Sequence, residues 1–152
     1  MDDTDRAILQ ELQRDGRMPN VELADRVHLS PSPCLRRVKR LESDGTIRGY
    51  RAVLDRRKLG LGLTVFTEVR STGHSPALAA GFEEAVAEID EIIGCYIVTG
   101  SSDFLLEIAV DDLAAYEQLY LTKLLTLPGV YDTKTNVVIR TMKEPGPLPV
   151  AR

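Results

Sequence analysis

The chain has 152 residues, of which 43% are hydrophobic and 28% are charged, and this is enough apolar material for one folded domain or two small ones. No apolar run approaches the roughly 18 residues that a membrane span needs. The start MDDTDR is acidic, where a signal peptide would be basic. These features exclude a membrane protein and predict a location in the cytoplasm.

The net charge of −4 is distributed unevenly along the chain. Residues 1–58 contain 13 basic and 10 acidic residues, whereas residues 59–152 contain 6 basic and 13 acidic residues. Within the first part, residues 34–58 hold nine basic residues and three acidic ones. A polyanion would be attracted to this segment, and the acidic second part would repel it.

Helical spacing of apolar residues predicts a first helix in the segment TDRAILQELQRDG. Ile8, Leu9 and Leu12 are spaced so that they fall on one face of a helix. Thr4 is expected to cap the start of this helix, and Gly16 to stop it.

A second, short helix is predicted in PNVELADRVHLS, with Asn20 as its N-cap and Ser30 at its end. The third helix lies in PSPCLRRVKRLESDG, begins with Pro31 in its first turn and ends at Gly45. We expect Leu35, Val38 and Leu41 to form its inward face.

Three short helices with a tight junction between the second and the third are typical of a helix-turn-helix domain that binds DNA. An outward row of arginines suits this role, because arginine can donate two hydrogen bonds to guanine, and both arginine and lysine pair with phosphates. The segment TIRGYRAVLD alternates like a short hairpin, which would make the domain winged. The alternative interpretation of these basic residues is a solvated charged face. The predicted DNA contacts are Ser30, Ser32, Pro33, Arg36, Arg37, Lys39, Arg40, Arg48 and Arg51.

The segment RRKLGLG mixes charge with glycine and predicts a linker at residues 59–62 between a first domain at 1–58 and a second at 63–142. The second domain shows the order strand, helix, strand, strand, helix, strand, with Ser75 and Pro76 starting its first helix. We therefore expect an α+β protein whose second domain is ferredoxin-like, with a four-stranded antiparallel sheet and two helices on one face. A partner subunit is expected to cover the other face. Residues 143–152, which contain three prolines, are expected to form a flexible tail.

Other residues give no sign of catalysis or of metal binding. Cys34 and Cys95 lack the spacing of a zinc site or a disulfide framework, and both are expected to be reduced and buried. His28 and His74 have no neighbouring cluster of ligands and are interpreted as solvated or capping residues. The sequence contains no phosphate-binding glycine loop and no nucleophile elbow. We therefore predict no enzyme activity, no metal and no cofactor.

Four segments together carry a resemblance to a known family: DRAILQELQRDGR, NVELADRVHLSPSPCLRRVKRLESDGTIRGYRAVL, VTGSSDFLLEIAV and LPGVYDTKTNVVI. The chain resembles the Lrp/AsnC family of transcriptional regulators, also called feast/famine regulators, over nearly its whole length. The resemblance implies an ACT-like RAM domain at the C-terminus, dimers that often assemble into octamers, and target DNA upstream of amino-acid metabolism genes. It also implies a small amino acid as effector, bound between dimers.

Carried over by position, the effector region implied by the resemblance comprises Ile97, Gly100, Ser101, Ser102, Asp103, Leu113, Asn136, Val137 and Val138. In this region Asp103 would accept the ammonium group of a zwitterion, and backbone N–H groups near Gly100 would donate to its carboxylate. The alternative is a hairpin whose glycine and aspartate only satisfy turn geometry. The serines of GSSDF and the residue Asn136 depart from the leucine-responsive branch, so the resemblance does not specify leucine.

The competing functional hypothesis is a small-molecule-binding or catalytic protein that uses the second domain without DNA. It accounts for the acidic second domain but leaves the basic third helix without a role. A ligand-turnover assay on residues 59–152 would distinguish the two hypotheses.

Overall fold

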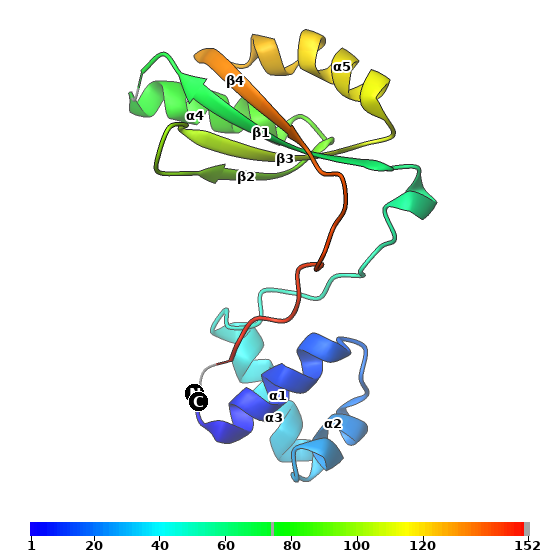
Figure 1. Ribbon diagram of the computed structural model, residues 1–152. Coiled ribbons are helices and arrows are strands. Elements are labelled where there is room, and N and C mark those ends of the chain that lie inside the picture. The colour runs from blue at the N-terminus through cyan, green and yellow to red at the C-terminus, as the bar shows by residue number, and fades with distance from the viewer. Residues whose placement is uncertain (74, 151–152) are drawn as a thin grey trace. The chain divides into compact units, whose positions relative to one another are not determined.

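The structure is a computed structural model that describes residues 1–73 and 75–150 (Figure 1). The chain divides into two compact units, one comprising Met1–Val53 and the segment from Met142 onward, the other comprising Leu54–Thr141. The domain limits expected from the sequence stay predictions. The expectations for His74 and for the last two residues of the tail lie outside the described residues.

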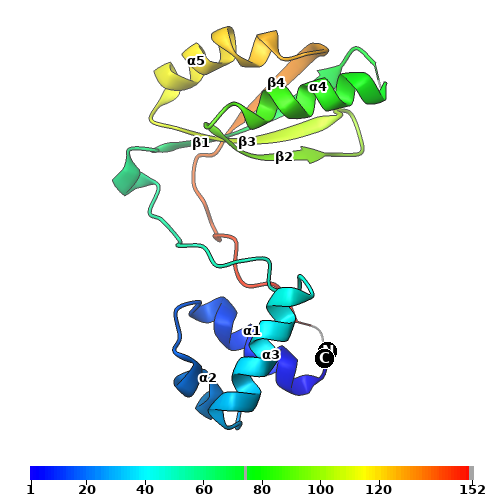
Figure 2. The same cartoon turned by 180° about the vertical axis from the view of Figure 1, so that it is seen from behind.

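The first unit contains the three helices that the sequence predicts: α1 (Asp3–Arg14), α2 (Asn20–Arg26) and α3 (Pro31–Ser43). The three helices pack against one another (Figure 2). They enclose a small core, because each has an apolar stripe that only its neighbours can remove from water. The buried residues of this core are Ile8, Met18, Leu23, Ala24, Val27, Cys34 and Leu41.

Helix α1 begins two residues earlier than expected, and Asp2 rather than Thr4 is its N-cap. The Asp2 carboxylate accepts a hydrogen bond from the backbone N–H of Asp5 at 2.8 Å, and the Asp5 carboxylate accepts one from the N–H of Asp2 at 3.0 Å. This reciprocal pair is a capping box, which satisfies two N–H groups that the helix start would leave without a partner.

The turn between α2 and α3 is fixed by two backbone features. His28 follows α2 with φ of +56°, and the N–H groups of His28 and Leu29 donate to the carbonyls of Asp25 and Ala24. This arrangement is a Schellman motif. Asn20 does not cap α2 as predicted; instead its Nδ2 donates to the carbonyl of Pro31 at 2.9 Å and connects the starts of the two helices.

The inward face of α3 differs from the prediction. Leu35 is exposed, and Cys34, Val38 and Leu41 form the face that packs on α1 and α2. Cys34, Val38 and Leu41 are separated by four and then three residues, which matches the 3.6 residues of one helical turn. The predicted set, Leu35, Val38 and Leu41, has two intervals of three and matches this period less well. This rotation of the face also changes which basic side chains of α3 point outward.

The segment after α3 does not form the predicted hairpin, since residues 46–55 contain no strand. Gly45, with φ of +78°, ends the helix as expected, and the N–H of Ile47 donates to the carbonyl of Leu41 at 2.8 Å. The hydroxyl of Tyr50 donates to Glu42 at 2.9 Å. Side-chain and helix-end contacts therefore hold this segment, without strand pairing.

The second unit has the predicted order of strands and helices. Its elements are η1 (Arg57–Leu59), β1 (Leu63–Ser71), α4 (Pro76–Ala87), β2 (Ile92–Ile97), β3 (Phe104–Val110), α5 (Leu113–Thr122), η2 (Leu124–Thr126) and β4 (Val130–Val137). The strands form one antiparallel sheet in the order β2-β3-β1-β4. Ser75 caps α4 by accepting a hydrogen bond from the N–H of Leu78, as expected.

The two faces of this sheet differ in character. Helices α4 and α5 lie on the same face (Figures 1 and 2) and bury Val65, Val69, Leu106 and Ile108. The opposite face, which we call the outer face, is lined by side chains of alternate residues along each strand. It carries Phe66, Glu68, Arg70, Tyr96, Leu105, Glu107, Lys134 and Asn136, and no described element of this unit covers it.

The C-terminal tail contains no helix or strand between Val138 and Val150, yet it contacts the first unit. The side-chain amide of Gln13 on α1 donates to the carbonyl of Leu148 at 3.2 Å and accepts from its N–H at 2.6 Å. The part of the tail near Leu148 is thus attached to α1.

Two further findings concern single residues and the helices. Cys34 is buried as expected, but Cys95 on the edge strand β2 is exposed, contrary to the prediction. None of the helices in residues 1–73 and 75–150 is both long enough and apolar enough to span a bilayer.

Candidate functional site

The basic residues of α3 fall into two groups. Arg36 and Lys39 are exposed, and no hydrogen bond or ion pair to another described residue engages either side chain. Ser30 and Ser32, at the start of the helix, are exposed, and Ser30 occupies the N-cap position without a capping hydrogen bond from its side chain. Pro33 is half-buried.

Arg37 and Arg40 instead form ion pairs within the first unit. Arg37 Nη1 lies 2.8 Å from Asp5 Oδ1 and 2.7 Å from Asp2 Oδ2, and Arg40 Nη2 lies 2.5 Å from Asp5 Oδ2. Asp5 is almost fully buried, with 1% of its side chain exposed, whereas the two arginines remain partly exposed. Of the three arginines of α3 that were predicted to contact DNA, two are therefore engaged in ion pairs and one, Arg36, is not. This difference was not predicted from the sequence.

The Asp5 carboxyl is held in its charged form. Burial raises the pKa of this carboxyl, but hydrogen bonds from the N–H of Asp2, from Arg37 and from Arg40 outweigh burial and lower the pKa to about 2. The carboxylates of Asp2 and Asp5 in turn raise the pKa of Arg37 above its ordinary value. The cluster is thus ionised at neutral pH.

Arg48 and Arg51 follow α3 in the extended segment and are exposed. In the described part of the chain, neither residue has a hydrogen-bonding or ion-pair partner. Arg36, Lys39, Arg48 and Arg51 are thus four cations without a partner among the described residues, and all four lie within residues 36–51.

The predicted effector turn connects β2 to β3. Gly100 has φ of +122°, a conformation that glycine adopts without steric cost. Asp103 Oδ2 accepts hydrogen bonds from the N–H of Ser71 at 2.7 Å and from its hydroxyl at 3.1 Å. Asp103 thereby joins the turn to the end of β1, in agreement with the turn-geometry interpretation of this residue.

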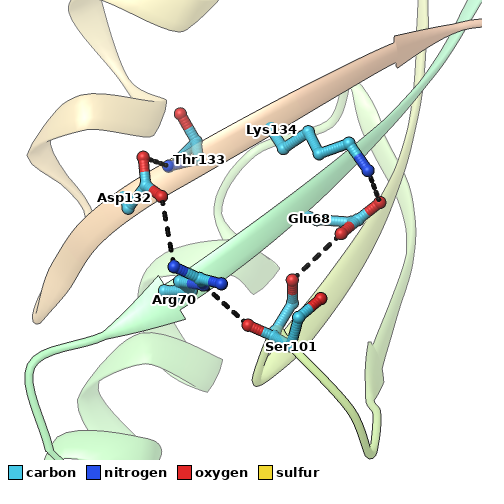
Figure 3. Close-up of a pocket in the computed structure, with 7 residues that line it drawn as sticks. Glu68, Arg70, Ser101, Asp132, Thr133 and Lys134 are labelled. Carbon is cyan, nitrogen blue, oxygen red and sulfur yellow. Dashed lines mark hydrogen bonds and ion pairs between the residues drawn. The ribbon is translucent and has the colours of Figure 1, made fainter.

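Beside this turn, a polar hollow of about 110 Å³ opens at the outer face (Figure 3). Glu68 on β1 accepts hydrogen bonds from the Ser102 hydroxyl at 3.0 Å, from Asn136 Nδ2 at 3.0 Å and from Lys134 Nζ at 3.3 Å. These hydrogen bonds, that from Asn136 foremost, lower the pKa of Glu68. Three residues predicted from the sequence, Ser101, Ser102 and Asn136, therefore lie around this hollow or against Glu68.

Arg70, also on β1, forms the opposite wall of the hollow. Its Nε donates to the carbonyl of Ser101 at 2.6 Å, and its Nη1 lies 3.8 Å from Asp132. Neither Glu68 nor Arg70 was among the residues predicted from the sequence. The available signal was two charged residues at alternate positions of an otherwise strand-like segment, which places both on the same face of the sheet.

A second, mainly apolar hollow of about 290 Å³ lies on the helix side of the same sheet end. Ile97 and Asp103, both predicted effector residues, line it together with Leu78, Phe82 and Phe104. The rings of Phe82 and Phe104 stack with centroids 4.2 Å apart. This hollow combines an apolar wall with one carboxylate at its rim.

The remaining predicted effector residues lie at the other end of the sheet. Val137 pairs with Val65, Val138 donates its N–H to Thr64, and Leu113 follows β3 at the start of α5. Val65 lies four residues from Val69 along β1, which corresponds to roughly 13 Å. One chain therefore does not bring Leu113, Val137 and Val138 next to the Gly100–Asp103 turn.

A helix-turn-helix unit with free cations, followed by a sheet unit with hollows at its end, defines a DNA-binding protein that carries a separate ligand-binding domain. Comparisons with known proteins agree with this class. Residues 1–48 match the family described as winged helix-turn-helix DNA-binding, and residues 64–148 match the Lrp/AsnC ligand binding domain. The chain belongs to the Lrp/AsnC family of transcriptional regulators. The family resemblance and the fold class predicted from the sequence are therefore confirmed.

Individual relatives resemble the chain over nearly its full length. The leucine-responsive regulatory protein of Escherichia coli K12 is 47% identical over 144 residues, which cover 95% of this chain and 88% of that protein. A transcriptional regulator from Neisseria meningitidis, solved with L-methionine, is 39% identical with a TM-score of 0.94, covering 99% of this chain and 97% of the other. A feast or famine regulatory protein from M. tuberculosis, also complexed with L-methionine, is 32% identical with a TM-score of 0.85. The match covers 94% of this chain and 95% of the other.

Proposed function

We propose that this regulator controls genes of amino-acid metabolism and that a small amino acid, bound between copies of the chain, is its effector. The observation that carries the proposal is the separation of the predicted effector residues. The Gly100–Asp103 turn and the group of Leu113, Val137 and Val138 lie at opposite ends of one sheet, so a site that uses both needs a second copy. The L-methionine bound to two solved relatives supports an amino acid as the ligand class.

The outer face of the sheet supports assembly of the protein. Tyr96 is 52% exposed there and pairs across the strands with Leu105, while Phe66 lies on the neighbouring strand. An uncovered face with these apolar side chains is suited to a partner subunit. We propose a dimer formed through this face and further assembly of dimers into an octamer.

In the DNA complex, α3 would lie in the major groove of duplex DNA. Arg36 and Lys39 would contact phosphates or guanine edges, helped by Ser30, Ser32 and Pro33 at the start of the helix, and Arg48 and Arg51 would bind neighbouring phosphates. In a dimer, two such helices would reach successive major grooves about 10 base pairs apart. Because its partner is chromosomal DNA, we place the protein in the cytoplasm.

The second unit would bind its ligand without chemical turnover. The family consists of regulators, and this argues against the competing hypothesis of a catalytic protein that acts without DNA. Ligand binding would alter the arrangement of dimers and so shift the population of DNA-binding assemblies.

The effector proposal is tested by thermal unfolding of the full chain with each common amino acid. A ligand at about 100 times its dissociation constant adds roughly 2.7 kcal/mol, which raises the unfolding midpoint by several degrees. We expect a shift with one or a few amino acids that Asp103→Asn abolishes. Asp90→Asn, an equal charge change at an exposed turn, should preserve the shift. No shift with any amino acid would refute the proposed effector class.

The DNA interface is tested by fluorescence anisotropy with a labelled duplex. The double substitution Arg36→Gln plus Lys39→Gln should weaken binding, whereas Arg14→Gln, an exposed residue of α1 paired with Glu11, should not. Equal binding by the double variant and the wild type would exclude α3 as the DNA-contacting helix.

A further inference from the structure

The buried carboxylate of Asp5 occupies two of the four basic side chains of α3. Each of its oxygens contacts a different arginine, Oδ1 with Arg37 and Oδ2 with Arg40. Asp2 contacts Arg37 a second time, and the N–H of Asp2 also donates to Asp5 Oδ2. The Asp5 carboxylate therefore has a donor on each oxygen and links the start of α1 to the middle of α3.

These ion pairs are costly to exchange for contacts with DNA. If both arginines left Asp5 for phosphates, a carboxylate with 1% exposure would lose its two charged partners. An arginine–phosphate contact at the protein surface is solvated and screened by salt, and its net gain is smaller than the penalty for an unpaired buried charge. The pairs with Asp5 should therefore persist when α3 binds DNA.

We infer that Asp5 is a specificity-determining residue of the DNA-binding unit, because it withholds Arg37 and Arg40 from the DNA backbone and leaves only Arg36 and Lys39 of α3 for contact. The inference rests on the proposed α3 interface. The charges of the two arginines cancel those of Asp2 and Asp5, so α3 attracts phosphates of any sequence less than its composition suggests. Fewer phosphate contacts reduce non-specific affinity, and base contacts then account for more of the discrimination.

The inference makes a quantitative prediction about salt. Each phosphate that a protein neutralises on duplex DNA contributes about 0.9 to the slope of log K against log salt concentration. Loss of Arg36 or Lys39 should therefore reduce the slope by about 0.9 per DNA-binding unit if that residue contacts a phosphate. Loss of Arg37 or Arg40 should leave the slope unchanged.

The experiment uses the full chain and a labelled duplex of arbitrary sequence, titrated by anisotropy over a series of NaCl concentrations. The variants are Arg36→Gln, Lys39→Gln, Arg37→Gln and Arg40→Gln, each checked for folding by circular dichroism. We expect a reduced slope only for the first two. If Arg37→Gln or Arg40→Gln reduces the slope as much as Arg36→Gln, the inference is overturned while the α3 interface stands. If no variant changes either the slope or the binding affinity, both the interface and the inference fail.

A second pair of variants tests the same inference by gain of function. Asp5→Asn should release the arginines, tighten non-specific binding and steepen the slope by up to about 1.8, because two more phosphates can be neutralised. Asp3→Asn removes the same charge from the same helix start, but among the described residues Asp3 pairs only with Arg6. Equal slopes for Asp5→Asn and Asp3→Asn, with both variants folded, would contradict the inference. If Asp5→Asn does not fold, the four variants of α3 decide the question.

Discussion

The hydroxyl of Tyr116 on α5 lies 3.0 Å from Oγ1 of Thr67, a fully buried polar residue in the middle of β1. The same tyrosine hydroxyl lies 2.7 Å from Oγ1 of Thr135 on β4. A buried hydroxyl needs a partner, so this contact sets where α5 packs across two strands.

Removal of the tyrosine hydroxyl should destabilise the second unit. We expect Tyr116→Phe to lower the free energy of unfolding by about 1–3 kcal/mol, because the Thr67 hydroxyl loses a partner in the core. The double variant Tyr116→Phe plus Thr67→Val should recover part of this loss, since it removes both polar groups. Urea denaturation gives the free energy of unfolding of the wild type and of both variants. If Tyr116→Phe lowers this free energy no more than the double variant does, the hydrogen bond between Tyr116 and Thr67 does not have the stabilising role assigned to it.

The ion-pair cluster of Asp5 predicts sensitivity to acid in the first unit. The pKa of the Asp5 carboxyl is about 2 in the folded protein, below its ordinary value of 3.8. Its contribution to stability is therefore complete above about pH 4 and is lost as the pH falls through the folded pKa. Unfolding of α1, followed by the amide signals of its residues, should show this dependence.

Asp5→Asn supplies the control for the acid experiment. It should cost roughly 3 kcal/mol near neutral pH, the lower end for a broken buried ion pair, because the arginines are partly exposed. It should also remove the part of the pH dependence that Asp5 causes. An unchanged decline in stability between pH 4 and pH 2 in this variant would assign the acid sensitivity to other carboxylates.

His28 should tolerate glycine but not a β-branched residue. With φ of +56° it occupies a left-handed conformation that costs a non-glycine residue about 1 kcal/mol. We expect His28→Gly to be neutral or to stabilise slightly, and His28→Val to destabilise by at least about 1 kcal/mol. Thermal unfolding of both variants tests this, and equal midpoints would show that the Schellman turn does not constrain the residue.

The two cysteines should differ in reactivity with a thiol reagent. Burial raises the pKa of the Cys34 thiol within the first core, and desolvation together with Glu83 raises the pKa of Cys95, but only Cys95 is exposed. The Cys95 thiol should therefore react in the native protein, and the Cys34 thiol should react only when the first unit unfolds. Cys95→Ser should eliminate the fast phase, and a fast phase that survives this substitution would mean that Cys34 is accessible.

Several features of the fold follow from local patterns and were predicted correctly. The three helices of the first unit and the β-α-β-β-α-β order of the second depend on apolar periodicity, and Ser75, Pro76 and Gly45 mark helix ends through their own backbone chemistry. Two of the errors arose where two nearby residues compete for one role. Asp2 replaced Thr4 as the cap because Asp5 can return the hydrogen bond, and Cys34 replaced Leu35 because the helix rotates by its 3.6-residue period.

The candidate sites were only partly accessible from the sequence. The turn at Gly100 and the basic residues of α3 could be located from the sequence, because the residue type alone indicates the turn preference of glycine and aspartate and the charge of arginine. Glu68 and Arg70 were missed, because their importance depends on which strands lie beside β1. Pairing between strands joins residues that are far apart in the chain, so a local sequence pattern does not predict it.

By itself, the sequence determined the order of the elements, the charge difference between the two parts and the family to which the chain belongs. Only the tertiary structure decided which arginines of α3 are free. Composition counts Arg36, Arg37, Lys39 and Arg40 as equivalent cations, yet Asp2 and Asp5, more than 30 residues earlier, form ion pairs with two of them. A charge attracts DNA only if it remains unpaired, and pairing depends on how α1 and α3 pack against each other.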